Sequence, residues 1–105
     1  MKLWVDDERP APDDSWLVVT NSTFAIDWIF YAKVTGIAIE EISLDHDLGG
    51  DDTGMKVLEA MIIMKFWPAK LTIHTSNPPA RQRMLAAANA EAPMQTEIFI
   101  IYSHI

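Results

Sequence analysis

The 105-residue sequence has no cysteine, few basic residues and no long apolar run. The lack of cysteine excludes disulfides, thiolate metal sites and cysteine nucleophiles, and it is typical of a reducing compartment. No apolar stretch approaches the ~20 residues of a membrane-spanning helix, and the opening MKLWVDDERP lacks the apolar core of a signal peptide. We therefore expect a cytoplasmic protein that does not enter the membrane.

The few basic residues are unevenly distributed. The chain has 15 acids against 8 bases, a net charge of −7. Residues 1–52 hold 12 of the acids but 3 of the bases, so the acidity belongs to the N-terminal half. Such a surface repels duplex DNA at long range. Binding to duplex DNA is therefore not expected, although a single nucleotide end could enter a pocket that carries a metal ion or an arginine.

Length and periodicity predict one α/β domain over residues 1–105. Strand-length apolar runs occur at Lys2–Val5, Trp16–Val19, Ile42–Leu44, Leu71–Ile73 and Ile98–Tyr102. Helical periodicity covers residues 22–34, 54–66 and 78–90, and Pro68 is expected to end the second helix. Nearly unbroken apolar strands that alternate with helices predict a parallel sheet covered on both faces, in a three-layer domain.

Two local patterns refine this fold. Asn77 suits the N-cap of the last helix, and the two prolines after it suit a first turn, where amide donors have no helical partner. Only about ten residues, DDERPAPDDS, separate the first two strands, whereas a parallel connection usually needs a dozen or more. We expect an extended loop there in place of the first crossover helix.

Polar residues follow three of the predicted strands. They are Asp6, Asp7, Glu8 and Arg9 after the first strand, Asp45, His46 and Asp47 after the third, and His74, Thr75, Ser76 and Asn77 after the fourth, with Arg81 one helical turn later. Ligands of open parallel sheets bind beyond the carboxyl ends of the strands. The three segments are therefore expected to meet at one rim.

The residue types at this rim suit a metal-bridged phosphate. Clustered carboxylates bind hard divalent cations, so the candidate ligands for magnesium or manganese are Asp6, Asp7, Asp45 and Asp47. The candidates for proton transfer near neutral pH are His46 and His74. The candidates for holding phosphate oxygens are Ser76, Asn77 and Arg81, together with the free amides of the last helix.

Each of these features has a structural explanation when it is taken alone. Paired acids after a strand are more often a turn than a ligand set, and a lone histidine is more often structural than catalytic. The segment DDTG, residues 51–54, precedes a helix and is assigned to capping. The coincidence of three polar clusters at one rim favours a site.

Three motifs, in order along the chain, resemble those of a known family. WVDDERP, SLDHDLG with DDTG, and IHTSNPPARQRM are similar to segments of the receiver domains of two-component response regulators. They are more similar to the family described as the cyclic-phosphate processing receiver domain. The similarity runs from Lys2 to about Ala90, and it implies a receiver-like (flavodoxin-like) fold with strand order 2-1-3-4-5.

The resemblance also implies roles for single residues. Asp6 and Asp7 match the acidic pair of the first strand, Asp45 matches the receiver phosphoacceptor, His46 and Asp47 match additions of the family, and His74, Ser76 and Asn77 match its fourth-strand signature. Our leading hypothesis is a metal-assisted phosphoesterase, or a binder, for a cyclic phosphate. The ligand would be an RNA end with a 2′,3′-cyclic phosphate or a cyclic nucleotide, with Asp45, His46 and His74 as catalytic candidates.

Two alternatives stay open. An ordinary receiver has a lysine at the end of its fifth strand, whereas this chain ends IYSHI, so an atypical receiver phosphorylated on Asp45 is the second choice. A non-catalytic receiver-like module could instead bind a partner protein through its acidic half. The enzyme hypothesis requires that Asp6, Asp45 and His74 point to a common position within metal-bridging reach.

Overall fold

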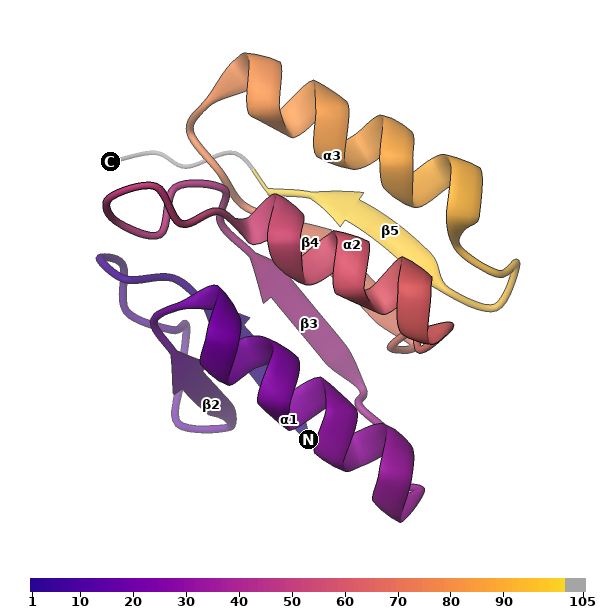
Figure 1. Cartoon of the computed structure of the whole chain (residues 1–105). Helices are drawn as coiled ribbons and strands as arrows, with labels where there is room; N and C mark the ends of the chain where they lie inside the picture. The colour runs from indigo at the N-terminus through magenta and orange to yellow at the C-terminus, as the bar shows by residue number, and fades with distance from the viewer. Residues whose placement is uncertain (102–105) are drawn as a thin grey trace.

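The computed structural model describes residues 1–101 (Figure 1). Its elements are β1 (Lys2–Val5), β2 (Trp16–Val19), α1 (Ser22–Thr35), β3 (Glu41–Leu44), α2 (Gly54–Met64), β4 (Lys70–Ile73), α3 (Pro78–Glu91) and β5 (Glu97–Ile100). All five strands pair in parallel in the order β2-β1-β3-β4-β5. The receiver-like sheet and its strand order are thus confirmed. Tyr102, expected in the last strand, lies outside the described residues.

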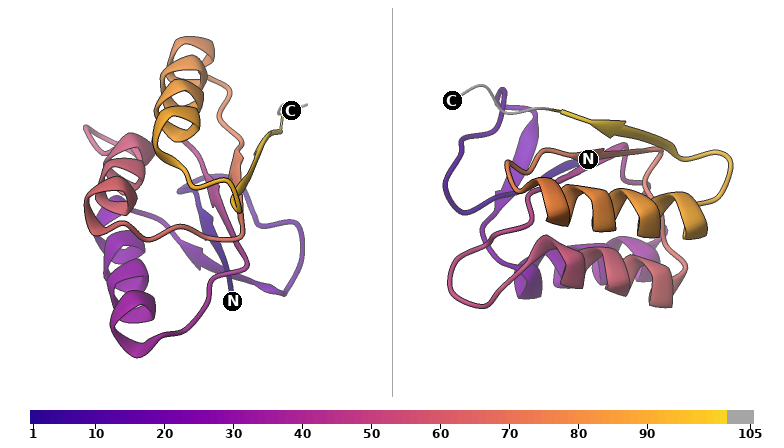
Figure 2. Two further views of the ribbon diagram at one scale, coloured as in Figure 1. Left: turned by 90° about the vertical axis from the view of Figure 1, so that its right-hand side faces the viewer. Right: turned by 90° about the horizontal axis from the view of Figure 1, so that it is seen from above.

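The three helices lie on the same face of the sheet (Figure 2). Each connects two parallel strands in the same direction across the sheet, and right-handed crossovers in one direction place their helices on one face. The connection from β1 to β2 runs the opposite way, and residues 6–15 form the expected loop without a helix. The described residues therefore form two layers, where the sequence led us to expect three, because the helix that would cover the second face is missing.

Side chains that alternate along the strands explain how a parallel sheet is stable with helices on one face. The positions toward the helices are aliphatic and fully buried in the main core cluster: Leu3, Val5, Ile42, Leu44, Leu71 and Ile73. They pack with Ala25, Ile29 and Ala32 of α1 and with Val57, Leu58 and Met61 of α2. The hydrophobic core therefore lies between the sheet and the helices.

The opposite face of the sheet carries a row of charges that alternate in sign. The strand register pairs Lys2 with Glu41, Glu41 with Lys70, and Lys70 with Glu97. The Lys70 ammonium also lies 4.7 Å from the centre of the Phe99 ring. Opposite charges on neighbouring strands attract, and the lysine stem covers apolar surface while its charge stays in water. The charged row reaches the protein surface, whereas Trp4, Ser43 and Thr72 on the same face are buried.

The helix ends follow local capping rules, with one difference from the prediction. Asn77 caps α3 as expected, because its side chain accepts a hydrogen bond from the Ala80 amide at 3.2 Å. The helix α2 ends at Met64, because Lys65 after it has a left-handed backbone (φ 54°), so the helix stops before Pro68. Among residues 1–101, none of the helices has the length and apolar character needed to cross a membrane.

The N-terminus of α1 is attached to the loop between β3 and α2. The Asp52 carboxylate accepts hydrogen bonds from the Ser22 amide at 2.7 Å and from the Ser22 hydroxyl at 2.5 Å. Asp52 was assigned to capping, but the helix that it caps is α1, whereas Thr53 precedes α2 without a side-chain cap bond. This contact fixes the loop that carries the polar cluster after β3.

Candidate functional site

The polar clusters meet at the carboxyl edge of the sheet because the backbone ladder continues beyond the strands. The amide of Asp6 bonds to Val19 O, the amide of Asp45 to Val5 O, and the amide of His74 to Leu44 O, at 3.0 to 3.1 Å. Each polar residue is therefore held in register with the neighbouring strand. The convergence that the sequence predicts is present in the structure.

Three carboxylates form a compact cluster at this edge. Asp6, Asp7 and Asp45 each offer an oxygen atom, and these atoms lie within 4.8 Å of one another. Asp6 and Asp45 are buried, whereas Asp7 is exposed. A Cβ atom at Gly49 would lie 3.0 Å from Asp7 Oδ2, so the backbone of the β3–α2 loop approaches this carboxylate closely.

Asp47, the fourth expected metal ligand, has other partners. Its Oδ1 lies 3.1 Å from His46 Nδ1, and its Oδ2 accepts a long 3.5 Å hydrogen bond from Asn77 Nδ2. The acid therefore faces the start of α3, beside the three-carboxylate cluster. The side chain of His46, which lies next to Asp47, is largely buried.

Both oxygens of the Asp6 carboxylate already have hydrogen-bond or ion-pair partners. Its Oδ1 accepts from the amides of Glu8 and Arg9 at 2.8 and 3.0 Å. Its Oδ2 lies 2.9 Å from His74 Nε2 and 3.4 Å from Arg9 Nε. Two carboxylate oxygens offer about four lone-pair positions, and all of them have a partner here. A metal ion at Asp6 would have to share or replace one of these contacts.

Arg9 neutralises the buried acids, a role that our sequence analysis did not assign to it. Its guanidinium lies 3.4 Å from an oxygen of Asp6 and 3.4 Å from Asp45 Oδ2, and it donates to the His74 carbonyl at 3.1 Å. The Trp4 indole donates to the Arg9 carbonyl at 2.9 Å and fixes the loop beneath it. The one signal in the sequence was the position of Arg9 three residues after Asp6.

His74 lies behind Asp6 as a buried side chain with both ring nitrogens hydrogen-bonded. Of the three residues that the enzyme hypothesis required at one position, Asp6 and Asp45 lie in the compact cluster and His74 does not. Its ring stacks on Trp4, with centres 4.0 Å apart and planes 8° apart, and its Nδ1 lies 2.7 Å from Ser43 Oγ. Burial lowers the pKa of His74, while the hydrogen bond and charge of Asp6 oppose that shift. The neutral ring donates from Nε2 to Asp6 and accepts at Nδ1 from the Ser43 hydroxyl.

The Asp45 carboxyl lies between groups of both charges. Burial, followed by the negative charge of Asp6, raises its pKa, whereas hydrogen bonds from Thr75 and His46 and the charge of Arg9 oppose that rise. The helix α2 begins directly against the Asp45 backbone. A Cβ atom at Gly54 would lie 1.8 Å from the Asp45 carbonyl oxygen, so glycine is required there.

A pocket of about 270 Å³ opens above these carboxylates. It is lined by Asp7, Glu8, Arg9, Asp45, Asp47, Gly49, Gly50 and Ser76. Of the expected phosphate-binding residues, Ser76 lines the pocket. Asn77 uses its oxygen to cap α3, and Arg81 Nη1 donates to the Thr75 carbonyl at 3.1 Å. The structure thus brings acids, an arginine and a hydroxyl together around one space.

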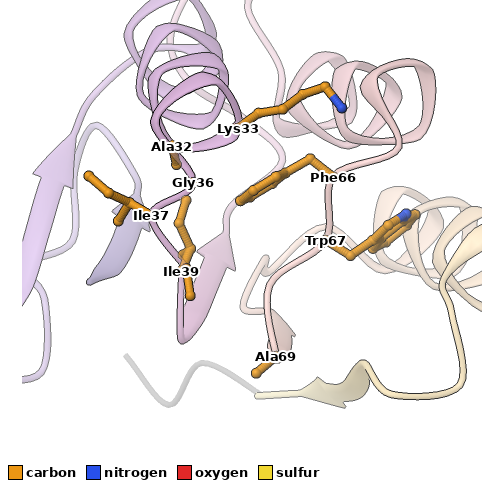
Figure 3. Close-up of a pocket in the computed structure, with 9 residues that line it drawn as sticks. Ala32, Lys33, Gly36, Ile37, Ile39, Phe66, Trp67 and Ala69 are labelled. Atoms are coloured by element: carbon orange, nitrogen blue, oxygen red, sulfur yellow. The ribbon is translucent and has the colours of Figure 1, made fainter.

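Larger pockets elsewhere are lined by fewer ionisable side chains. One of about 360 Å³ lies at the opposite edge of the sheet, where α1 and α2 end (Figure 3). Ile37, Ile39, Phe66 and Trp67 give it apolar walls, and Lys33 is its one ionisable residue (Figure 3). Pocket size therefore does not identify the site; the converging polar side chains do.

Comparison with known families shows to which family the chain belongs. Residues 1–90 match the family described as the cyclic-phosphate processing receiver domain. The chain belongs to this family. No curated protein and no solved structure gives a significant match. The part that matches this receiver family contains β1 to β4 and every residue of the pocket, whereas β5 lies beyond it.

Proposed function

We propose that this protein binds a cyclic phosphate in the pocket at the carboxyl edge of the sheet and hydrolyses it with a divalent metal ion. The observation that carries the proposal is the cluster of Asp6, Asp7 and Asp45, with ligand oxygens within 4.8 Å of one another beside a pocket that Arg9 and Ser76 also line. The association of the family with cyclic-phosphate processing supports it.

The donor set fits magnesium or manganese. All three clustered side chains offer carboxylate oxygen, the ligand that these hard cations prefer. Asp7 and Asp45 line the pocket, whereas the oxygens of Asp6 are engaged by backbone amides, His74 and Arg9. When bound, the ion would supply positive charge that polarises a phosphoryl group and favours ionisation of a water molecule.

The remaining residues would bind the ligand and move protons. Ser76 presents an exposed hydroxyl to the pocket, and Arg9 offers guanidinium donors for phosphate oxygens. Asp47 holds His46 Nδ1 and leaves its Nε2 for proton exchange with the leaving oxygen. In this proposal His74 positions Asp6, since its two ring nitrogens are both engaged and it is buried away from the pocket.

Turnover of defined substrates tests this function. Nucleoside and oligonucleotide 2′,3′-cyclic phosphates and 3′,5′-cyclic nucleotides are incubated with magnesium or manganese, and products are followed by phosphorus NMR. We expect ring opening that EDTA and Asp45→Asn abolish, while Asp13→Asn, in the exposed β1–β2 loop, retains it. Activity that persists in Asp45→Asn, or none on any substrate, contradicts the proposal.

Phosphorylation of Asp45 is the weaker alternative. An attacking carboxylate oxygen must be free, whereas Asp45 Oδ2 lies 3.4 Å from the Arg9 guanidinium. Its Oδ1 also accepts a hydrogen bond from the His46 amide at 2.8 Å. These contacts suit a held ligand group better than a phosphoacceptor. Incubation with acetyl phosphate and intact-mass analysis would show a phosphorylated chain if this alternative were correct.

A further inference from the structure

The helix α1 is apolar on both sides, although only one side faces the core. Ala25, Ile29 and Ala32 are buried against the rest of the domain. The outer side carries five of the eleven large hydrophobic side chains that are exposed among residues 1–101: Phe24, Trp28, Phe30, Tyr31 and Val34. A helix that is apolar all round is normally buried on all sides, and large exposed apolar patches mark interaction sites.

Four of the outer side chains form a groove. Phe24, Asp27, Trp28 and Tyr31 follow the i, i+3, i+4, i+7 spacing of one helix face and line a space of about 390 Å³. The Trp28 and Tyr31 rings pack edge to face, with centres 5.9 Å apart and planes at 87°. This contact gives the groove a firm wall, and exposed aromatic residues of this kind dominate binding energy at protein interfaces.

The charge of the groove distinguishes between possible partners. Asp27 is its charged residue, and none of the ion pairs among residues 1–101 involves it. It lies in the half of the chain that holds 12 acids against 3 bases. If a second copy of the chain bound here, Asp27 and the acidic half of one copy would face the same acidic groups of the other, and these like charges would repel. A cationic partner would be attracted over a distance and would pair with Asp27 on contact.

We propose that the outer face of α1 docks a basic amphipathic helix of a partner protein. The apolar side of the partner helix would fill the groove, and a lysine or arginine beside it would pair with Asp27 and lie over the Trp28 ring. The groove spans from Phe24 to Tyr31, about 10 Å along the axis at the rise of an α-helix, so two to three turns of a partner cover it. This surface lies outside the proposed phosphate pocket and does not depend on its chemistry.

Synthetic peptides test both the shape and the charge of this surface. The probe is an 18-residue leucine–lysine peptide with leucine on one helical face, and the matched peptide has glutamate in place of every lysine. Isothermal titration should show one lysine peptide bound per chain, with the glutamate peptide at least tenfold weaker. Phe24→Ser and Asp27→Lys should each weaken the lysine peptide at least tenfold, and Asp27→Lys should strengthen the glutamate peptide.

Two control variants distinguish binding in the groove from non-specific binding to exposed apolar side chains and from attraction to net negative charge. Ile63→Ser removes another exposed apolar side chain, on α2, and Asp14→Lys makes the same charge change as Asp27→Lys in the β1–β2 loop. Both should retain at least half of the wild-type affinity, and circular dichroism checks that all variants are folded. The proposal is overturned if neither peptide binds or if Asp14→Lys weakens binding as much as Asp27→Lys. It is also overturned if ultracentrifugation shows a dimer that Phe24→Ser dissociates, because a second copy then occupies the face.

Discussion

His74 Nε2 lies 2.9 Å from Asp6 Oδ2, and the two residues are 3% and 1% exposed. Sixty-eight positions separate them in the chain. The same ring is held from its other side by Ser43 and from below by Trp4. A chain of contacts therefore runs from the charged face of the sheet to the carboxylate cluster, and the orientation of Asp6 depends on the histidine that follows β4.

Removing this histidine should cost more stability than removing its outer partner. His74→Phe keeps a ring for Trp4 to stack on but removes one donor from the buried Asp6 carboxylate, so we expect a loss of ~3 kcal/mol in the free energy of unfolding. Ser43→Ala should cost ~1 kcal/mol, because a neutral hydrogen bond contributes less. Urea unfolding measures both, and equal losses would show that Asp6 does not depend on His74.

Stability should fall as the pH drops below about 6.5 because of His74. Its folded pKa is lowered from the ordinary value of 6.5, so the unfolded chain takes up the proton first. The contribution of neutral His74 is complete above pH 6.5 and is lost as the pH falls toward the folded pKa. Urea midpoints between pH 5 and pH 8, measured with EDTA, should show this slope in wild type and a flatter one in His74→Phe. Parallel slopes would assign the effect to another group.

Arg9 and a divalent cation should compete for the same carboxylates. The guanidinium lies 3.4 Å from oxygens of Asp6 and Asp45, where a metal ion would have to bind. Arg9→Gln should therefore bind manganese about tenfold more tightly, and saturating manganese should stabilise it by ~1.4 kcal/mol more than wild type. Arg83→Gln is the control, and thermal melts with and without manganese give the readout. Weaker manganese binding in Arg9→Gln would show that Arg9 supports the metal site.

Gly54 should be irreplaceable, whereas Gly36 should tolerate a side chain at moderate cost. A Cβ atom at Gly54 would meet the Asp45 carbonyl oxygen at 1.8 Å, so Gly54→Ala must move α2 away from the site, at an expected ~3 kcal/mol. Gly36 has a left-handed backbone with φ 75° and no atom within 4 Å of its Cβ position, so Gly36→Ala should cost ~1 kcal/mol. Urea unfolding ranks the two variants, and the reverse order would contradict the packing described.

The sequence predicts the elements well because their periodicities are strong. Both ends of α1 and α3 agree with the prediction to one residue. The bounds of β1 and β2 agree with it, whereas β3, β4 and β5 each begin one residue earlier than predicted and β5 ends at Ile100. The number of layers was not predicted, because Trp4 and Phe99 made the strands read as unbroken apolar runs. The alternation was nevertheless visible in KLWV, EISL and KLTI, each with a charged first residue.

The position of the candidate site could be predicted from the sequence, but its side-chain contacts could not. Parallel strands bring their carboxyl ends to one edge whatever the register, so Asp6, Asp45 and His74 had to lie near one another. Which atoms meet depends on the register and on side-chain rotamers. The contact of His74 with Ser43 and the reach of Arg9 to Asp45 therefore appear only in three dimensions.

The charged row on the open face changes which substitutions this protein can accept. On the helix side, Leu3 and Ile42 are enclosed, and even one added methylene must displace a neighbour. On the other side, Val18 and Phe99 are almost half exposed, so residues of many sizes fit there without repacking the core. Exposed strand positions such as Val18 and Phe99 should therefore tolerate substitution better than the enclosed positions that alternate with them, whereas Ser43 and Thr72, on the same face, are buried and should not.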